Sequence, residues 1–117
     1  MGFTYVSVLV RGRKEKTLDM LVETDSTYIA LPPEDIEDLG LHETPYRVKL
    51  TSADKEVGAR LFLAEVEVKG RKGSAFVAEL ETPKALLGVY ALETLGFKVN
   101  PRSGELEEIS PEGGYLL

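Results

Sequence analysis

The sequence contains no cysteine, no tryptophan and only one histidine among its 117 residues. Without cysteine there is neither a disulfide framework nor a thiol nucleophile, which favours an intracellular, cytoplasmic protein. Long apolar runs are also missing, so no membrane span is expected. No basic segment followed by an apolar stretch opens the chain, so no signal peptide is expected. The formal net charge of -6 argues against a nucleic-acid partner.

What the sequence does contain is typical of a folded domain. Hydrophobic residues make up 43% and charged residues 29%, which excludes a disordered chain. A chain of this length supports one domain with a modest core, and we assign residues 1–117 to a single domain. The basic cluster of Arg11, Arg13, Lys14 and Lys16 surrounds Gly12 and is interpreted as a solvated hairpin turn.

Most of the chain has the pattern of short strands. Segments rich in Val, Thr and aromatic residues, separated by turn signals, predict strands over 3–10, 17–22, 28–31, 46–50, 57–69, 74–80, 97–99 and 106–109. Glu65 and Glu67 alternate with apolar residues and should face solvent. Two short helices are expected, over 32–40, where prolines suit the first turn and Gly40 the end, and over 87–95. This pattern favours a small barrel or sandwich.

Two segments carry the most specific signal. The first is Leu21-Val22-Glu23-Thr24-Asp25-Ser26-Thr27, followed by Leu31-Pro32; the second is Leu86-Leu87-Gly88, followed by Leu95-Gly96. Their order and spacing, from about Tyr5 to Leu106, resemble a subunit of the retroviral-type (retropepsin-like) aspartic peptidases. The resemblance implies an all-β fold with one or two short helices, a closed β-barrel. It also implies a catalytic-loop motif at 21–27, a flap hairpin at about 50–62, and a Leu-Leu-Gly segment with a helix at 86–96.

The motif is altered at two positions relative to this family. The family has Asp-Thr/Ser-Gly, whereas here Glu23 stands at the position of Asp and Asp25 at the position of Gly. Asp25-Ser26-Thr27 is an alternative register for the motif, but it leaves Leu31-Pro32 two residues too close. We therefore prefer the register with Glu23 at the catalytic position.

The resemblance also implies a mechanism and a partner. In this class two carboxylates, one from each subunit, share a proton and activate a water molecule, so a homodimer acting on a peptide or protein substrate is expected. The predicted catalytic residues are Glu23, Thr24 and Asp25. The predicted substrate-binding residues are Ser26, Thr27, Ala53, Asp54, Lys55, Leu87 and Gly88, with Ala53 to Lys55 near the flap tip.

Other interpretations stay open. The extra methylene of Glu23 also suits a catalytically silent peptide-binding or dimerisation module on the same fold, and a small β-barrel without any site is a third interpretation. A cation at Glu23 and Asp25 has no ligand-spacing signature, so no metal and no cofactor are predicted. His42 is expected on the surface, and Leu86, Leu87, Leu92 and Leu95 in the core. The terminal Tyr115-Leu116-Leu117 is either a frayed end or, as the resemblance implies from the interleaved chain ends of viral members, a segment that packs across the dimer.

Overall fold

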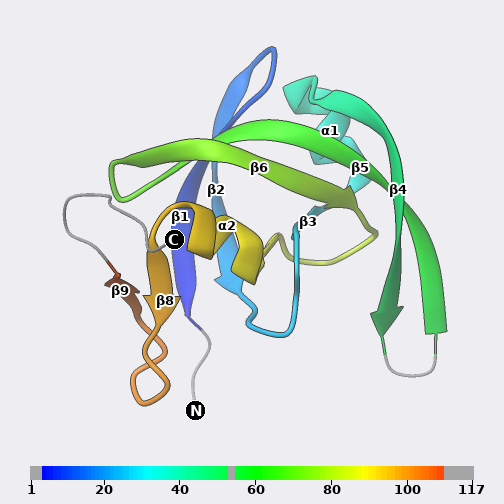
Figure 1. Cartoon of the computed structure of the whole chain (residues 1–117). Coiled ribbons are helices and arrows are strands. Elements are labelled where there is room, and N and C mark those ends of the chain that lie inside the picture. Colours follow the sequence, from blue (N-terminus) through cyan, green and yellow to red (C-terminus); the bar gives the residue numbers. More distant parts are fainter. Residues whose placement is uncertain (1–3, 53–54, 110–117) are drawn as a thin grey trace.

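A computed structural model describes residues 4–52 and 55–109 of the chain. The described part is rich in β-strands and has two short helices, as the sequence predicts (Figure 1). In chain order the elements are β1 Tyr5–Arg11, β2 Glu15–Val22, β3 Ile29–Leu31, α1 Pro33–Leu39, β4 His42–Ser52, β5 Lys55–Val68, β6 Arg71–Glu79, β7 Leu86–Leu87, α2 Val89–Thr94, β8 Phe97–Val99 and β9 Leu106–Glu108.

The main sheet closes on itself. Its strands follow the order β1-β2-β7-β3-β6-β5-β4, and β1 also pairs with β5, from Leu9 opposite Glu67 to Arg11 opposite Glu65. Six strands therefore form a ring, and β4 is attached to the outer edge of β5. This ring confirms the expected closed β arrangement. Strands β8 and β9 form a separate antiparallel pair.

Alternating side chains fill the inside of the ring. In β1, Val6, Val8 and Val10 are buried, whereas in β5 Val66 and Val68 are buried next to the outward-facing Glu65 and Glu67. This is the period of two expected of strands with one buried face. Leu87, Leu92 and Leu95 also lie in the core, as predicted, together with Met20, Ile29 and Phe97. Leu86, which was also predicted there, is only half-buried. No helix of the described residues is long and apolar enough to cross a membrane.

The first helix forms for the reasons given by its sequence. Pro33 occupies the first turn, Glu34 and Asp35 lie at its positive end, and Gly40 ends it in the left-handed conformation with φ of 62°. The Gly40 N–H donates to the Glu37 carbonyl oxygen at 3.1 Å. The basic cluster forms the turn between β1 and β2, as predicted.

Several element boundaries differ from the sequence prediction, and three of the differences have a structural reason. The hairpin of β4 and β5 is longer than expected, because exposed polar residues continue both strands without a burial pattern. Strand β6 begins at Arg71 rather than residue 74, since the turn occurs at Lys69 and Gly70, both with positive φ. Leu87 does not begin a helix: it pairs in β7 with Val22 of β2, and α2 starts at Val89.

Candidate functional site: a cleft at the acidic loop

The acidic loop, residues 23–28, connects β2 to β3 and is held by the segment that follows β7. The Glu23 N–H donates to the Leu87 carbonyl oxygen at 3.0 Å. Further along, the N–H groups of Val89 and Tyr90 donate to the carbonyl oxygens of Ser26 and Thr27 at 2.8 and 3.1 Å. The two segments that stand out in the sequence, 21–27 and 86–88, therefore lie side by side. These backbone bonds fix the loop from both ends.

Close packing tightens the same contact. Gly88 is buried with an extended backbone, φ of -89° and ψ of 174°, so its conformation alone does not demand glycine. The close packing around it does require glycine. A Cβ atom at position 88 would lie 2.7 Å from the carbonyl oxygen of Ser26 and would also collide with the carbonyl oxygen of Tyr28. Gly88 is thus the position at which the β7–α2 connection can touch the acidic loop.

Hydrogen bonds inside the loop fix its backbone and orient the Glu23 carboxylate. The Asp25 N–H donates to Oε1 of Glu23 at 3.1 Å, and the Ser26 N–H donates to the Glu23 carbonyl oxygen at 3.1 Å. The Ser26 hydroxyl donates to the carbonyl oxygen of Tyr28 at 2.9 Å. One oxygen of the Glu23 carboxylate is therefore tied to the loop backbone, and the other has no hydrogen bond among the described residues. Lys69 is the only non-glycine residue with positive φ in the described ranges, so Asp25 does not adopt the left-handed conformation.

A cleft of about 730 Å³ opens at this loop. This volume is within the usual range for ligand-binding sites. Figure 1 shows the β2–β3 connection on the same side of the molecule as the end of β4 and the start of β5. The loop and the hairpin both contribute to its walls, which are lined by Glu23, Asp25, Ser26, Thr27, Tyr28, Ala30, Lys49, Leu50, Thr51, Val57, Ala78, Leu80 and Leu86.

The predicted site residues divide into three groups. Glu23, Asp25, Ser26 and Thr27 line the cleft together. Thr24 and Lys55 are exposed outside the lining, at the loop turn and at the start of β5. Leu87 and Gly88 are buried behind the loop, where they hold it in place. Ala53 and Asp54 lie outside the described residues, as does the terminal Tyr115-Leu116-Leu117.

Several lining residues were not identified from the sequence. Ala78 and Leu80 come from β6 and its end, because β3 and β6 pair in parallel with Ala30 opposite Ala78. That contact joins segments almost 50 residues apart in the sequence, and no local sequence pattern predicts it. Leu50 and Leu86 carried a usable signal, since each lies in a segment singled out from the sequence. His42 is exposed at the start of β4, as predicted.

The charges of the cleft are mainly acidic. Glu23 is half-buried and Asp25 exposed, and Lys49 is the only basic residue among the described residues that line the cleft. Over the ranges 4–52 and 55–109, no group of three or more His, Asp and Glu side chains is arranged to hold a metal ion. Glu23 and Asp25 place two carboxylates beside an open cleft.

Comparisons with known proteins agree with this geometry. A family model described as aspartyl protease matches residues 6–91, more than half of the chain. Among the matching solved structures is EIAV protease complexed with the inhibitor HBY-793, with a TM-score of 0.63 and 21% sequence identity. The alignment covers 85% of this chain and 93% of that chain, and at this identity it shows a shared fold. No curated protein matches the sequence.

Proposed function

This chain belongs to the aspartyl protease family and has a retropepsin-like fold, and we propose that it is an aspartic-type endopeptidase. The observation that supports this best is the position of Glu23. Its carboxylate lies in the cleft, and the N–H of Asp25 holds one of its oxygens at 3.1 Å. A carboxylate fixed by its own loop and open to a cleft is suited to act as a general acid or base.

The reaction requires a second carboxylate, which we assign to Glu23 of a second copy of the chain. Two carboxyl groups that lie close together share one proton, because like charges at that distance do not both ionise. The ionised group takes a proton from water, and the water attacks the peptide carbonyl. The protonated group polarises that carbonyl and then supplies a proton to the leaving amine. A two-fold axis through the acidic loops generates this pair from one gene product.

The β4–β5 hairpin has the role of a flap in this proposal. Lys49, Leu50, Thr51 and Val57 face the cleft from the hairpin, opposite the acidic loop. An extended peptide bound between hairpin and loop is shielded from water on one side and meets the carboxylates on the other. Thr24 lies at the exposed turn of the loop, where its hydroxyl is available to a second protomer.

A catalytically silent peptide-binding or dimerisation module is the second candidate. Glu23 is one methylene longer than the Asp of the family motif. Two positions later, Asp25 adds a side chain where the family has glycine. A misplacement of about 1 Å costs roughly 100-fold in rate. Under this alternative the cleft and hairpin bind peptide, and the carboxylates do not hydrolyse it.

A protease assay on an unbiased peptide mixture between about pH 3 and pH 8, the range in which carboxylate dyads titrate, separates the two candidates. We expect the protein to cleave, Glu23→Gln to remove cleavage, and Glu34→Gln, an exposed change in α1, to leave it unchanged. Cleavage that survives Glu23→Gln contradicts the assigned role. No cleavage by any of the three proteins contradicts the peptidase and favours the silent module.

A further inference from the structure

Three aromatic side chains connect the cleft to the outer surface of the sheet. Tyr28, which lines the cleft, packs edge-on against Phe76 of β6, with ring centroids 6.5 Å apart and an interplanar angle of 89°. It packs in the same manner against Tyr90 of α2, at 5.7 Å and 86°. The three rings come from a loop, a strand and a helix, and together we call them the aromatic platform. Their edge-to-face arrangement is the favoured one for aromatic pairs.

Two members of the platform are exposed to solvent. Phe76 is 41% exposed and Tyr90 is 55% exposed, although the protein has only nine aromatic residues in all. Leu63, the register partner of Phe76 on β5, is 39% exposed. Contiguous exposed apolar side chains of this kind mark surfaces that bind other molecules.

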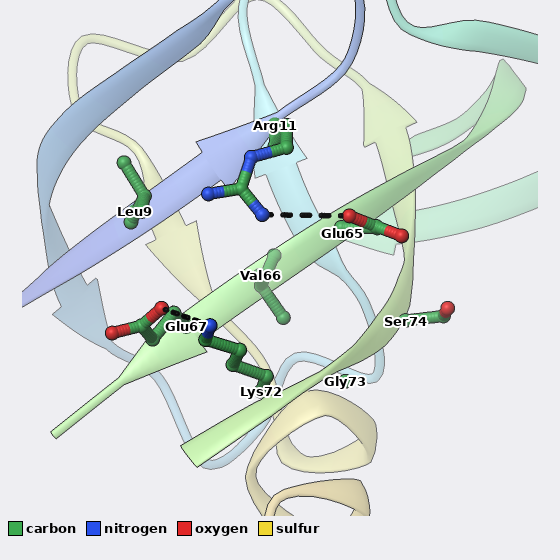
Figure 2. Close-up of a pocket in the computed structure, with 8 residues that line it drawn as sticks. All are labelled: Leu9, Arg11, Glu65, Val66, Glu67, Lys72, Gly73 and Ser74. Atoms are coloured by element: carbon green, nitrogen blue, oxygen red, sulfur yellow. Dashed lines mark ion pairs between the residues drawn. The ribbon is translucent and has the colours of Figure 1, made fainter. Parts of the chain in front are cut away.

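The platform continues the cleft rather than forming a separate patch. Ala78 lines the cleft, and Phe76 lies two residues away in β6, so both side chains are on the same face of the sheet. Beyond Phe76 the same face becomes charged. Arg11 pairs with Glu65 at 3.5 Å and Lys72 with Glu67 at 3.8 Å. Figure 2 shows both ion pairs. The apolar surface is therefore bounded by ion pairs at one end and opens into the cleft at the other.

We propose that the aromatic platform is an extended subsite that binds an apolar side chain of the peptide held in the cleft. This inference rests on the proposed function, since it takes a peptide in the cleft as given. A peptide lying between the acidic loop and the β4–β5 hairpin and leaving the cleft past Tyr28 reaches Phe76 and Tyr90. An aromatic or large aliphatic side chain covers these rings and displaces water from them. The platform thus selects peptides by a residue that does not flank the cleaved peptide bond.

The experiment uses binding, so that it does not depend on hydrolysis. The Glu23→Gln protein is panned against a phage-displayed library of random 12-residue peptides, and the selected peptides are synthesised for fluorescence-polarisation measurements. We expect an aromatic or large aliphatic residue to be enriched at one fixed position. In the Glu23→Gln background, adding Phe76→Ser and Tyr90→Ser should raise Kd about tenfold, equal to about 1.4 kcal/mol, the upper part of the range for one aromatic pair.

Matched variants separate a loss of the platform from a loss of folding. Phe76→Tyr with Tyr90→Phe keeps all three rings and should leave Kd within twofold, and thermal denaturation shows whether each variant is folded. The single variant Tyr90→Ser changes the more exposed ring and should raise Kd by less than the double variant does. Selected peptides with Lys or Ser at the fixed position, or a Kd unchanged by the Ser variants, would overturn the subsite.

The failures of the two proposals are distinguishable. If the peptide mixture is cleaved but the Ser variants bind selected peptides as tightly as their parent, the peptidase stands and the subsite is wrong. If nothing is cleaved but binding depends on Phe76 and Tyr90, the subsite is supported and the protein is a catalytically silent binding module. Selected peptides that bind equally well when Val57→Trp obstructs the cleft would show a docking surface independent of it and would contradict the subsite.

Discussion

A Cβ atom on Gly88 would lie 2.7 Å from the carbonyl oxygen of Ser26. The two residues belong to segments separated by about 60 positions, and their backbones touch because one of them has no side chain. The adjoining N–H groups of Val89 and Tyr90 complete the contact by donating to Ser26 and Thr27. The placement of the acidic loop therefore depends on glycine at position 88.

Gly88→Ala should destabilise the protein by about 1–3 kcal/mol, the usual cost of forcing an extra carbon into a packed site. The loop carbonyls cannot withdraw without losing their bonds to α2. Urea denaturation measures the change. Gly58→Ala is the matched control, because a Cβ atom at Gly58 in β5 meets nothing within 4 Å. Equal stability of the two variants would show that the loop moves freely away from position 88.

The sequence predicts some of these features better than others. The alternation of Val6, Val8 and Val10, and of Val66 and Val68 with two glutamates, identifies strands because burial on one face leaves a period of two. The first helix is predicted by Pro33 and Gly40, whose backbone preferences act locally. Such features depend on neighbours in the chain, and the structure confirms them.

Other features depend on contacts that the chain order does not reveal. Two residues, Leu86 and Leu87, are enough to form β7, because β2 and β3 lie on either side of them. No propensity indicates so short a strand. The parallel pairing of β3 with β6 places Ala78 in the cleft. The same pairing brings Tyr28, which precedes β3, next to Phe76 of β6 in the aromatic platform. The motif predicted where the loop would be, whereas the surroundings of that loop follow from the closed sheet.

Restoring the family motif should increase peptidase activity. The double change Glu23→Asp with Asp25→Gly removes one methylene from each member of the proposed dyad and one carboxylate from each loop. Since about 1 Å of misplacement costs roughly 100-fold, we expect kcat/KM to increase by about 10- to 100-fold. The measurement is steady-state cleavage of the best substrate in the peptide mixture.

The matched control for that experiment is Glu23→Asn with Asp25→Gly, which has the shorter side chain without its charge. It should be inactive. An unchanged rate in the Asp-Gly variant would mean that the extra methylene is already accommodated by the site. Activity in the Asn-Gly control would mean that the carboxylate at position 23 does not take part in the reaction.

Arg60 holds together the base of the β4–β5 hairpin. Its Nε donates to Glu79 Oε1 at 2.9 Å and its Nη2 to Glu79 Oε2 at 2.7 Å, while Nη1 donates to Glu43 at 3.2 Å. The hydrogen bond that Arg60 donates to Glu79 is the main cause of the raised pKa of Arg60. Because that pKa is raised, the guanidinium stays charged at neutral pH, and its contribution to stability is lost only in strongly alkaline solution.

Arg60→Lys keeps the charge but loses the paired geometry, so it should lower the thermal midpoint. The loss should be small and should shrink in high salt, because the Arg60 side chain is 40% exposed. Arg47→Lys on β4 is the control, since Arg47 has no ion pair within the described part of the chain. A larger loss at position 47 than at position 60 would contradict this account of the hairpin base.

Removing a negative charge from the acidic loop should strengthen dimerisation. In the proposed dimer each protomer contributes Glu23 and Asp25, which line the same cleft, so a two-fold axis through the acidic loops brings four carboxylates together. Repulsion among them opposes association, and salt weakens that repulsion. We expect Asp25→Asn to lower the dissociation constant of the dimer about tenfold at low ionic strength, a difference of about 1.4 kcal/mol, whereas Asp38→Asn, an exposed change in α1, should leave it unchanged. Sedimentation equilibrium measures each value. A dimer weakened by Asp25→Asn would contradict an axis through the acidic loops.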